Sequence, residues 1–313
     1  MTRVLVRNPH SGDRKRSLHA KELAEKRGFD VRNSTAPGET LTLAREAAEE
    51  GAAAVVACGG DGTLNEVVRG VDEADGLDRT TLGVVPAGTG NDFADNVGIR
   101  GVEHAFKVLD SGRERRLDMG MVRTSSGRTD VDERPRPFLN SCVCGLTAEA
   151  STRTRPDLKK RLGVVAYVLS TMQHSRGFEG LQLDVRAGAN RDPVWQGEAV
   201  MLLVGNGRRF PGEERRQANM EDGLLNGVII EDVPAIDYLA TGAADKLLRR
   251  GASHLTRVKV PHLVVDASKP RQFSLDGEMV ERRHLEADAR QGAMRFAVGE
   301  RYQPTPEENH ADR

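Results

Sequence analysis

The sequence has little of what marks secreted, membrane-spanning or disulfide-stapled proteins. Its three cysteines among 313 residues are too few for a disulfide framework, so a reducing compartment is the simplest expectation. The longest apolar runs, at 52–58 and 199–205, are much shorter than the ~20 residues that cross a bilayer. The first residues show no signal-peptide pattern. Together these absences predict a soluble, cytoplasmic protein.

A basic excess is missing as well. The chain has 46 Lys and Arg against 47 Asp and Glu, for a net charge of −1. Because nucleic-acid binders usually carry a basic excess or stripe, we expect no nucleic-acid partner. The eight histidines form no H-E-x-x-H pattern, and Cys142 and Cys144 do not form a C-x2-C pair. The sequence therefore predicts buried thiols and no zinc site.

Strand-like and helix-like segments alternate over the first third of the chain. Short apolar runs lie at 4–6, 53–57 and 82–85, with a further short strand around Val31, and helical stripes lie at 18–24, 43–48, 64–71 and 102–109. Such alternation is typical of a parallel sheet with helices on both faces.

Near residue 115 the pattern changes, and strand-like runs dominate. They lie at 138–144, 181–185, 198–204, 228–231, 258–265 and 272–275, with helical stripes at 158–172 and 236–248 and a polar loop at 124–137. We expect an α/β domain over residues 1–117, a β-rich domain over 118–284 and a flexible tail over 303–313.

The segment C-G-G-D-G-T-L-N-E at 58–66 follows a buried strand and opens a helix. Glycines allow positive φ angles and let another backbone or a phosphate approach closely. A helix N-terminus attracts anions through free N–H groups and the helix dipole. Asp61 then either faces a Mg²⁺ ion that bridges phosphates or caps the helix. A glycine turn with a capping aspartate remains the alternative to a phosphate site.

Three other strand ends have similar compositions. P-A-G-T-G-N-D-F at 86–93 follows the fourth strand, N-P-H-S-G at 8–12 follows the first, and Ser34-Thr35 follows the second. In a parallel sheet these ends share one edge, so the loops can face one ligand. No Walker A or G-x-G-x-x-G segment is present, which excludes the ordinary P-loop and Rossmann routes.

In this order and spacing, NPHSG, GGDGTLNEVV and PAGTGNDFA resemble the diacylglycerol kinase catalytic-domain family, which includes sphingosine kinases and microbial single-chain lipid kinases. FLNSCVCGLTAEA, LLVGNGRRF, MEDGLLNGVII and FSLDGEMV extend the resemblance over residues 3–300. NAD kinases and phosphofructokinases share the GGDG loop, but neither is expected to continue with G-T-G-N-D-F and S-L-D-G-E.

The resemblance implies a kinase that transfers phosphate from ATP, with Mg²⁺, to a lipid such as diacylglycerol. Its α/β domain, of the NAD-kinase and diacylglycerol-kinase type, would bind ATP, and residues 285–302 would rejoin it after a β-sandwich-like second domain. The predicted ATP-binding residues are Asn8, Pro9, His10, Ser11, Gly12, Thr35, Gly59, Gly60, Asp61, Gly62, Thr63, Asn65, Glu66, Gly88, Thr89, Asn91 and Asp92.

Two carboxylates stand in the segment F-S-L-D-G-E. Asp276-Gly277 favours a sharp turn after a strand, and a carboxylate near a lipid hydroxyl can accept its proton. A hairpin turn with a solvated Glu278 is the alternative. The resemblance implies Glu278 as general base with Asp276 beside it, and Asp61 completes the predicted catalytic set. It also implies a second-domain Mg²⁺ site at Asp222 and Leu225.

The helix expected at 158–172 has a basic start and an apolar stripe. Such a helix either lies on an anionic membrane surface or packs on the core. Without a spanning segment, we expect peripheral and reversible membrane association. A NAD-kinase-like small-molecule kinase and a non-catalytic nucleotide- or lipid-binding relative remain alternatives, and the sequence leaves open whether the chain forms a homodimer.

Overall fold

The computed structural model describes residues 2–9, 12–125, 134–145, 180–207, 218–231 and 255–306. The helices expected at 158–172 and 236–248, and the tail from residue 307 on, lie outside these ranges. Within them, no helix combines the length and apolar character needed to cross a membrane.

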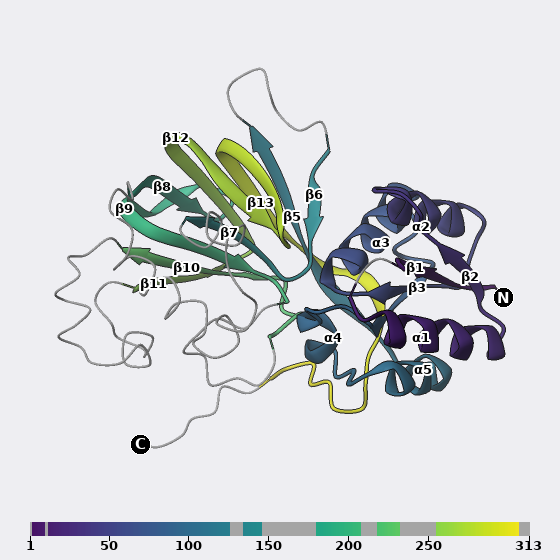
Figure 1. The fold of residues 1–313 in the computed structure, drawn as a ribbon. Coiled ribbons are helices and arrows are strands. Elements are labelled where there is room, and N and C mark those ends of the chain that lie inside the picture. The colour runs from purple at the N-terminus through teal and green to yellow at the C-terminus, as the bar shows by residue number, and fades with distance from the viewer. Residues whose placement is uncertain are drawn as a thin grey trace, which may run out of the picture.

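The strand–helix alternation predicted for the first part of the chain is confirmed. Four parallel strands stand in the order β2-β1-β3-β4, with α2 and α3 on one face and α1 and α5 on the other (Figure 1). The elements are β1 (Arg3–Arg7), α1 (Arg14–Lys26), β2 (Asp30–Asn33), α2 (Glu39–Glu49), β3 (Ala54–Gly59), α3 (Asp61–Glu73), β4 (Thr81–Pro86), α4 (Asp92–Asn96) and α5 (Val102–Ser111).

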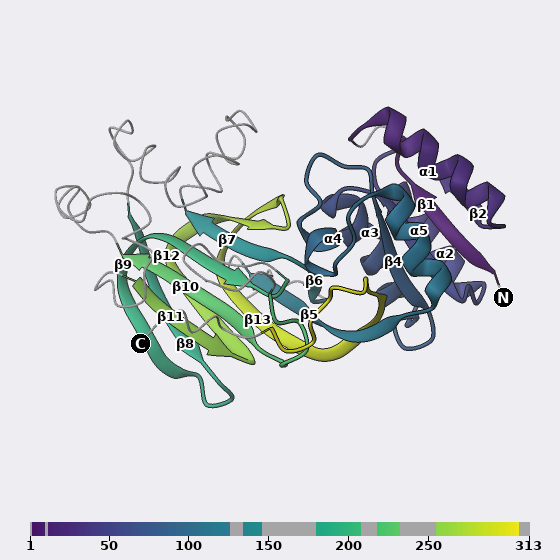
Figure 2. The same cartoon turned by 90° about the horizontal axis from the view of Figure 1, so that it is seen from below.

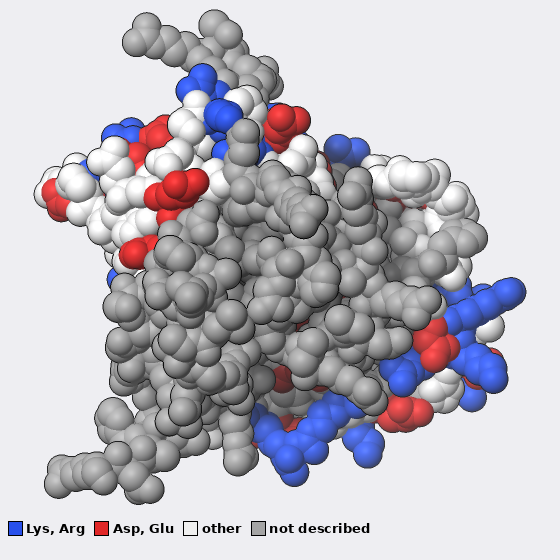
Figure 3. Space-filling view, turned by 60° about the vertical axis from the view of Figure 1, so that its left-hand side comes forward, with Lys and Arg blue, Asp and Glu red and all other residues white. Residues whose placement is uncertain are grey.

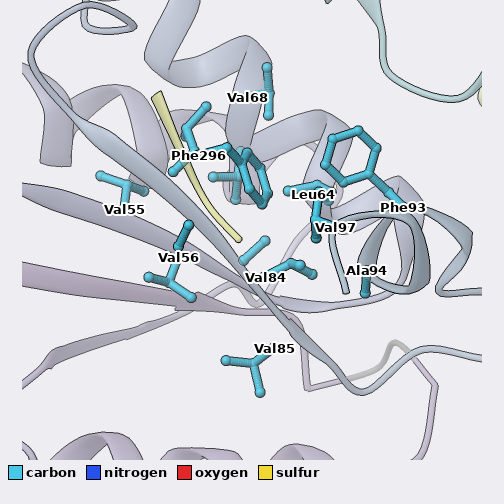
Figure 4. Close-up of a cluster of buried hydrophobic side chains, with 14 of the residues drawn as sticks. Val55, Val56, Leu64, Val68, Val84, Val85, Phe93, Ala94, Val97 and Phe296 are labelled. Carbon is cyan, nitrogen blue, oxygen red and sulfur yellow. The ribbon is translucent and has the colours of Figure 1, made fainter. Parts of the chain in front are cut away.

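The core of this part lies between β3, β4 and the helices that cover them. All residues of β3 are buried, as expected for a central parallel strand. The helical spacing at 64–71 is confirmed, because its apolar residues on α3 are all buried. Figure 4 shows Leu64 and Val68 of this face together with Phe93 and Phe296. The two phenylalanine rings pack edge to face, with centroids 5.1 Å apart.

The second part is β-rich, as predicted, and its strands pair antiparallel with one another. They are β5 (Glu114–Ser125), β6 (Arg136–Phe138), β7 (Ser141–Gly145), β8 (Leu181–Ala187), β9 (Asp192–Gly205), β10 (Leu225–Glu231), β11 (Leu255–Val260), β12 (His262–Leu275) and β13 (Glu278–Ala297).

Several predicted boundaries were wrong. The strand expected at 138–144 is divided into β6 and β7 at Leu139 and Asn140, whose N–H groups donate to the carboxylate of Asp276 instead of to a neighbouring strand. The strand expected at 258–265 is divided at Pro261, which has no N–H to donate to a ladder. The loop expected at 124–137 is shorter, because β5 continues to Ser125 and β6 begins at Arg136.

Two long strands, β5 and β13, join the two parts of the chain (Figure 2). β13 begins against β12 and pairs with β5 along much of its length, and near its end Phe296 pairs in parallel with Leu82 of β4. A bulge between Arg290 and Met294 interrupts the β5–β13 ladder. The buried carboxylate of Asp118 accepts the N–H of Gly292 within this bulge, at 2.8 Å.

Candidate active site

The carboxyl ends of β1 to β4 lie at one edge of the sheet, as the parallel pairing requires. Backbone hydrogen bonds continue the ladder past the strand ends. Ser34 N–H donates to the carbonyl of Arg7 at 2.9 Å, and Ala87 N–H donates to that of Gly59 at 3.0 Å. The four predicted segments therefore stand side by side, except that His10 and Ser11 lie outside the described residues.

Three of the loop glycines, Gly12, Gly60 and Gly88, pack backbone against backbone. Gly12 has φ +72°, and a Cβ there would lie 2.1 Å from the carbonyl oxygen of Ala87. A Cβ on Gly88 would lie 2.2 Å from the Cα of Gly60. Real Cβ atoms do not approach other atoms so closely. The contacts between loops therefore explain why Gly12, Gly60 and Gly88 are glycines.

Two glycines have free space instead. A Cβ on Gly62 would meet nothing within 4 Å, and one on Gly90 would meet only Asp61 Oδ2, at 3.5 Å. Gly62 lies in the first turn of α3, whose N–H groups lack intrahelical acceptors. This turn is the place where a phosphate can approach the helix end.

We expect Gly62→Ala to separate ligand binding from folding. Alanine is favoured over glycine inside a helix by up to about 1 kcal/mol, so the free energy of unfolding should stay the same or rise. ATP affinity should fall, because the new methyl group stands where a phosphate would approach. Gly88→Ala is the matched control, since its Cβ clash should lower the melting temperature. Unchanged ATP affinity in Gly62→Ala would place the phosphates elsewhere.

Asp61 connects the two glycine loops. Its N–H donates to the carbonyl of Gly90 at 3.2 Å, and its carboxylate accepts the N–H groups of Asp92 at 3.0 Å and Phe93 at 3.1 Å. The side chain therefore caps α4, not its own helix, whose N-cap is Gly60. Burial raises the pKa of Asp61, and the two N–H donors partly oppose that shift.

The other predicted ATP-binding residues take several kinds of position. Thr63 is buried against Gly59, while Thr89 is exposed. The Asn91 amide closes its own loop on Gly88, with bonds of 3.2 Å and 2.8 Å. The Thr35 hydroxyl donates to Glu39 at 2.8 Å.

Asp276 joins the second part of the chain to α3. It occupies a tight turn between β12 and β13, with φ +48° at Asp276 and +101° at Gly277, as in two-residue hairpin loops. Its carboxylate accepts N–H groups from Leu139 at 2.6 Å and Ser141 at 2.8 Å, and the side-chain amide of Asn65 at 2.9 Å. Burial raises the pKa of Asp276, and these hydrogen bonds oppose the shift.

Glu278 begins β13, and both of its carboxylate oxygens have cationic partners. Arg136 Nη1 lies 2.9 Å from Oε1, and Arg69 Nη1 lies 3.4 Å from Oε2. Arg69 follows Asn65 by four residues, so the two side chains share a face of α3. The structure thus brings α3 and the D-G-E turn together through Asn65–Asp276 and Arg69–Glu278.

Sequence reasoning did not single out Arg69 and Arg136. Helical periodicity could have placed Arg69 beside Asn65. Arg136 falls in a segment predicted as loop, and no local pattern marks it.

The second-domain residues Asp222 and Leu225 lie near Lys259 of β11. Asp222 Oδ2 is 2.6 Å from Lys259 Nζ, and Oδ1 accepts the N–H of Leu224 at 3.0 Å. Leu225 begins β10 and pairs with Val260. Among the described residues no group of three or more His, Cys, Asp or Glu side chains could hold a metal ion. The Lys259 ammonium neutralises Asp222 in this structure, and the second-domain Mg²⁺ site at Asp222 and Leu225 stays a prediction.

An α/β sheet with glycine loops at its carboxyl edge is thus joined to a β-rich part that presents carboxylates. The profile of the diacylglycerol kinase catalytic domain matches residues 2–122. Two relatives, each described as "Probable lipid kinase YegS", come from Shigella flexneri and Escherichia coli (strain SMS-3-5 / SECEC); both are 30% identical over 93% of this chain and 94% of their own. The chain belongs to the diacylglycerol kinase catalytic-domain family.

Solved structures share the fold. A diacylglycerol kinase from Bacillus anthracis strain Sterne matches with a TM-score of 0.70 and 18% identity, over 96% of this chain and 98% of that one. Another structure from the same organism matches with a TM-score of 0.75 and 21% identity, over 96% of each chain.

Proposed function

We propose that this protein is an ATP-dependent lipid kinase that transfers the γ-phosphate to a hydroxyl of a lipid such as diacylglycerol. One observation carries the proposal: α3 begins at the glycine loops, and its Asn65 and Arg69 hold the D-G-E turn. The predicted nucleotide site and the predicted base are therefore attached to the same helix. Family membership supports a lipid as the acceptor.

In the proposed mechanism the phosphates of ATP lie at Gly62 and Gly90, where the backbone leaves space. The carboxylate of Asp61 accepts the backbone N–H of Asp92, and burial, together with the charge of Asp92, raises the pKa of Asp61. Carboxylate ligands of this kind suit Mg²⁺. Each Asp61 oxygen that accepts one N–H retains a lone pair for a metal. When bound, Mg²⁺ would neutralise charge on the β- and γ-phosphates.

Glu278 is the proposed general base. The lipid hydroxyl oxygen forms a bond to the γ-phosphorus while the bond from phosphorus to the bridging oxygen of ADP breaks, and the hydroxyl proton passes to the Glu278 carboxylate. Asp276 cannot readily take this role, because its carboxylate already accepts four hydrogen bonds. We propose that Asp276 instead holds the turn that positions Glu278.

The domain limits belong to the same proposal: residues 1–117 rejoined by 285–302, and a β-sandwich-like domain over 118–284. A screen of ADP release with diacylglycerol, other lipid alcohols and NAD as acceptors tests the function. Turnover with a lipid alcohol supports it, turnover with NAD alone would support a NAD-kinase-like enzyme, and ATP binding without turnover would support a non-catalytic relative.

The start of α1 is the proposed membrane surface. Arg14, Lys15 and Arg16 occupy its first turn, where the helix dipole disfavours cations, and Asp13 offsets only part of their charge. Leu18 follows one turn later at 43% exposure, and no other large apolar side chain is exposed among the described residues. Figure 3 shows Lys and Arg side chains along the lower and right-hand margins of one face, with Asp and Glu side chains among them.

We expect the protein to bind anionic vesicles at low salt and to leave them at high salt, because exposed charges are screened within about 8–10 Å at physiological salt. Lys15→Gln should weaken vesicle binding about five-fold, since one cation near such a surface contributes about 1 kcal/mol. Lys107→Gln on α5 removes the same charge elsewhere and serves as the control. Salt-independent binding, or equal losses in the two variants, would contradict this surface.

A further inference from the structure

The two glycine loops predicted to hold ATP contain no Lys or Arg side chain. Segments 59–66 and 86–92 contain Asp61, Glu66 and Asp92 but neither Lys nor Arg. Phosphoryl transfer depends on positive charge near the transferred group, supplied by metal ions and by Arg or Lys. A cationic side chain for this purpose must therefore come from another segment of the chain.

Two arginines lie at the Glu278 end of the contact between α3 and the D-G-E turn, whose other end is the Asn65–Asp276 hydrogen bond. Arg69 from α3 and Arg136 from β6 both pair with Glu278, and among the described residues neither guanidinium has another ion-pair partner. The side chains of Arg69 and Arg136 are 25% and 31% exposed, whereas that of Glu278 is 53% exposed. One carboxylate balances one of the two positive charges, so this group of three residues keeps a net charge of +1.

The geometry of this group suits a phosphate. A guanidinium can bind two phosphate oxygens at once through its parallel N–H groups. The Arg69 contact, at 3.4 Å, is longer than that of Arg136, at 2.9 Å, and exposed ion pairs of this kind contribute little stability. A phosphate dianion can therefore replace the carboxylate between the arginines at small cost.

We propose that Arg69 and Arg136 form a phosphate site beside Glu278. This site receives the transferred phosphoryl group and then holds the phosphate monoester product. That the product held here is a phosphate monoester rests on the proposed function. The predicted affinity of the site for phosphate does not depend on it. Glu278 occupies the site in the free protein. When Glu278 accepts the hydroxyl proton it becomes neutral, the ion pairs weaken, and both guanidiniums turn to the phosphate.

Titration of the full chain with inorganic phosphate, followed by calorimetry, tests this site. Arg69→Gln and Arg136→Gln should each weaken phosphate binding at least ~10-fold, because a charge-assisted bidentate contact is lost. Glu278→Gln should strengthen binding several-fold, because the competing carboxylate is gone. Arg134→Gln removes an exposed charge two residues from Arg136 and should change nothing. Thermal melts confirm that each variant is folded.

The opposite signs of these changes distinguish the site from phosphate bound at the glycine loops. Equal phosphate affinity in all four variants, or no phosphate binding in either the wild type or Glu278→Gln, would overturn the proposal. The lipid kinase assay on the same preparations reports on function separately. The phosphate results can hold in a protein without kinase activity, and a kinase whose Arg69 and Arg136 variants turn over normally would retain the function and lose the site.

Discussion

Glu278→Gln is expected to lower kcat by about 10²–10⁴-fold, the range typical for removal of a general base. The substitution keeps the shape and can still accept a bond from Arg136, but it removes the proton acceptor. ATP affinity should stay near that of the wild type, because Glu278 stands at the D-G-E turn and not at the glycine loops. Single-turnover kinetics and ATP titration on one preparation measure both quantities.

Glu281→Gln makes the same chemical change on an exposed residue three positions further along β13 and should leave kcat unchanged. If Glu278→Gln turned over normally with ATP bound, Glu278 would only contribute to the ion pairs of the turn. The role of base would then fall to Asp276 or to another residue.

Asp61→Ala should abolish ATP-dependent turnover and also reduce stability. Its carboxylate caps α4 through the N–H groups of Asp92 and Phe93, and loss of a helix cap costs about 0.5–2 kcal/mol. The protein should remain folded, because the core around α3 and β3 is untouched. Turnover and the denaturant midpoint of the same variant provide the two measurements.

Asp61→Asn separates the two roles of this side chain. Its amide oxygen can still accept an N–H from α4, so stability should recover in part, while the charge available to a metal is lost. Turnover that recovers together with stability would show that Asp61 acts only through the fold of the loops.

The local sequence predicted the first part of the fold well, because apolar runs and helical periodicity each point to a single element type there. The run at 53–57 is continuously apolar and forms the buried β3, and the apolar positions at 64–71 follow the helical period and form the buried face of α3. β5 and β13 were missed as strands because charged residues interrupt their apolar ones. β5 opens with Glu114, Arg115 and Arg116, and its buried run at 117–122 includes Asp118. β13 contains four Arg and three Glu, and a register shift breaks its alternation.

The sequence located the candidate site but not its contacts. The glycine loops and the D-G-E turn were found from local composition, and the turn has the hairpin geometry that Asp-Gly favours. Asp61 was expected to cap its own helix or to face a metal, whereas its N–H partners are 31 and 32 residues away. Arg69 and Arg136 are separated from Glu278 by 209 and 142 residues. Pairings at such distances depend on the fold and leave no trace in one local segment.

Because β13 is one continuous strand, its number of residues sets where the Glu278 carboxylate lies relative to the sheet of the first part. The strand starts at Glu278 and reaches the nucleotide-side sheet at Phe296, and each residue advances a strand by about 3.3 Å. Loss of one residue between them would move the carboxylate by roughly the full reach of a hydrogen bond and turn alternate side chains to the wrong face. Insertions or deletions in this stretch should therefore lower both the activity and the free energy of unfolding, because Leu285, Ala287, Met294 and Phe296 of β13 are buried.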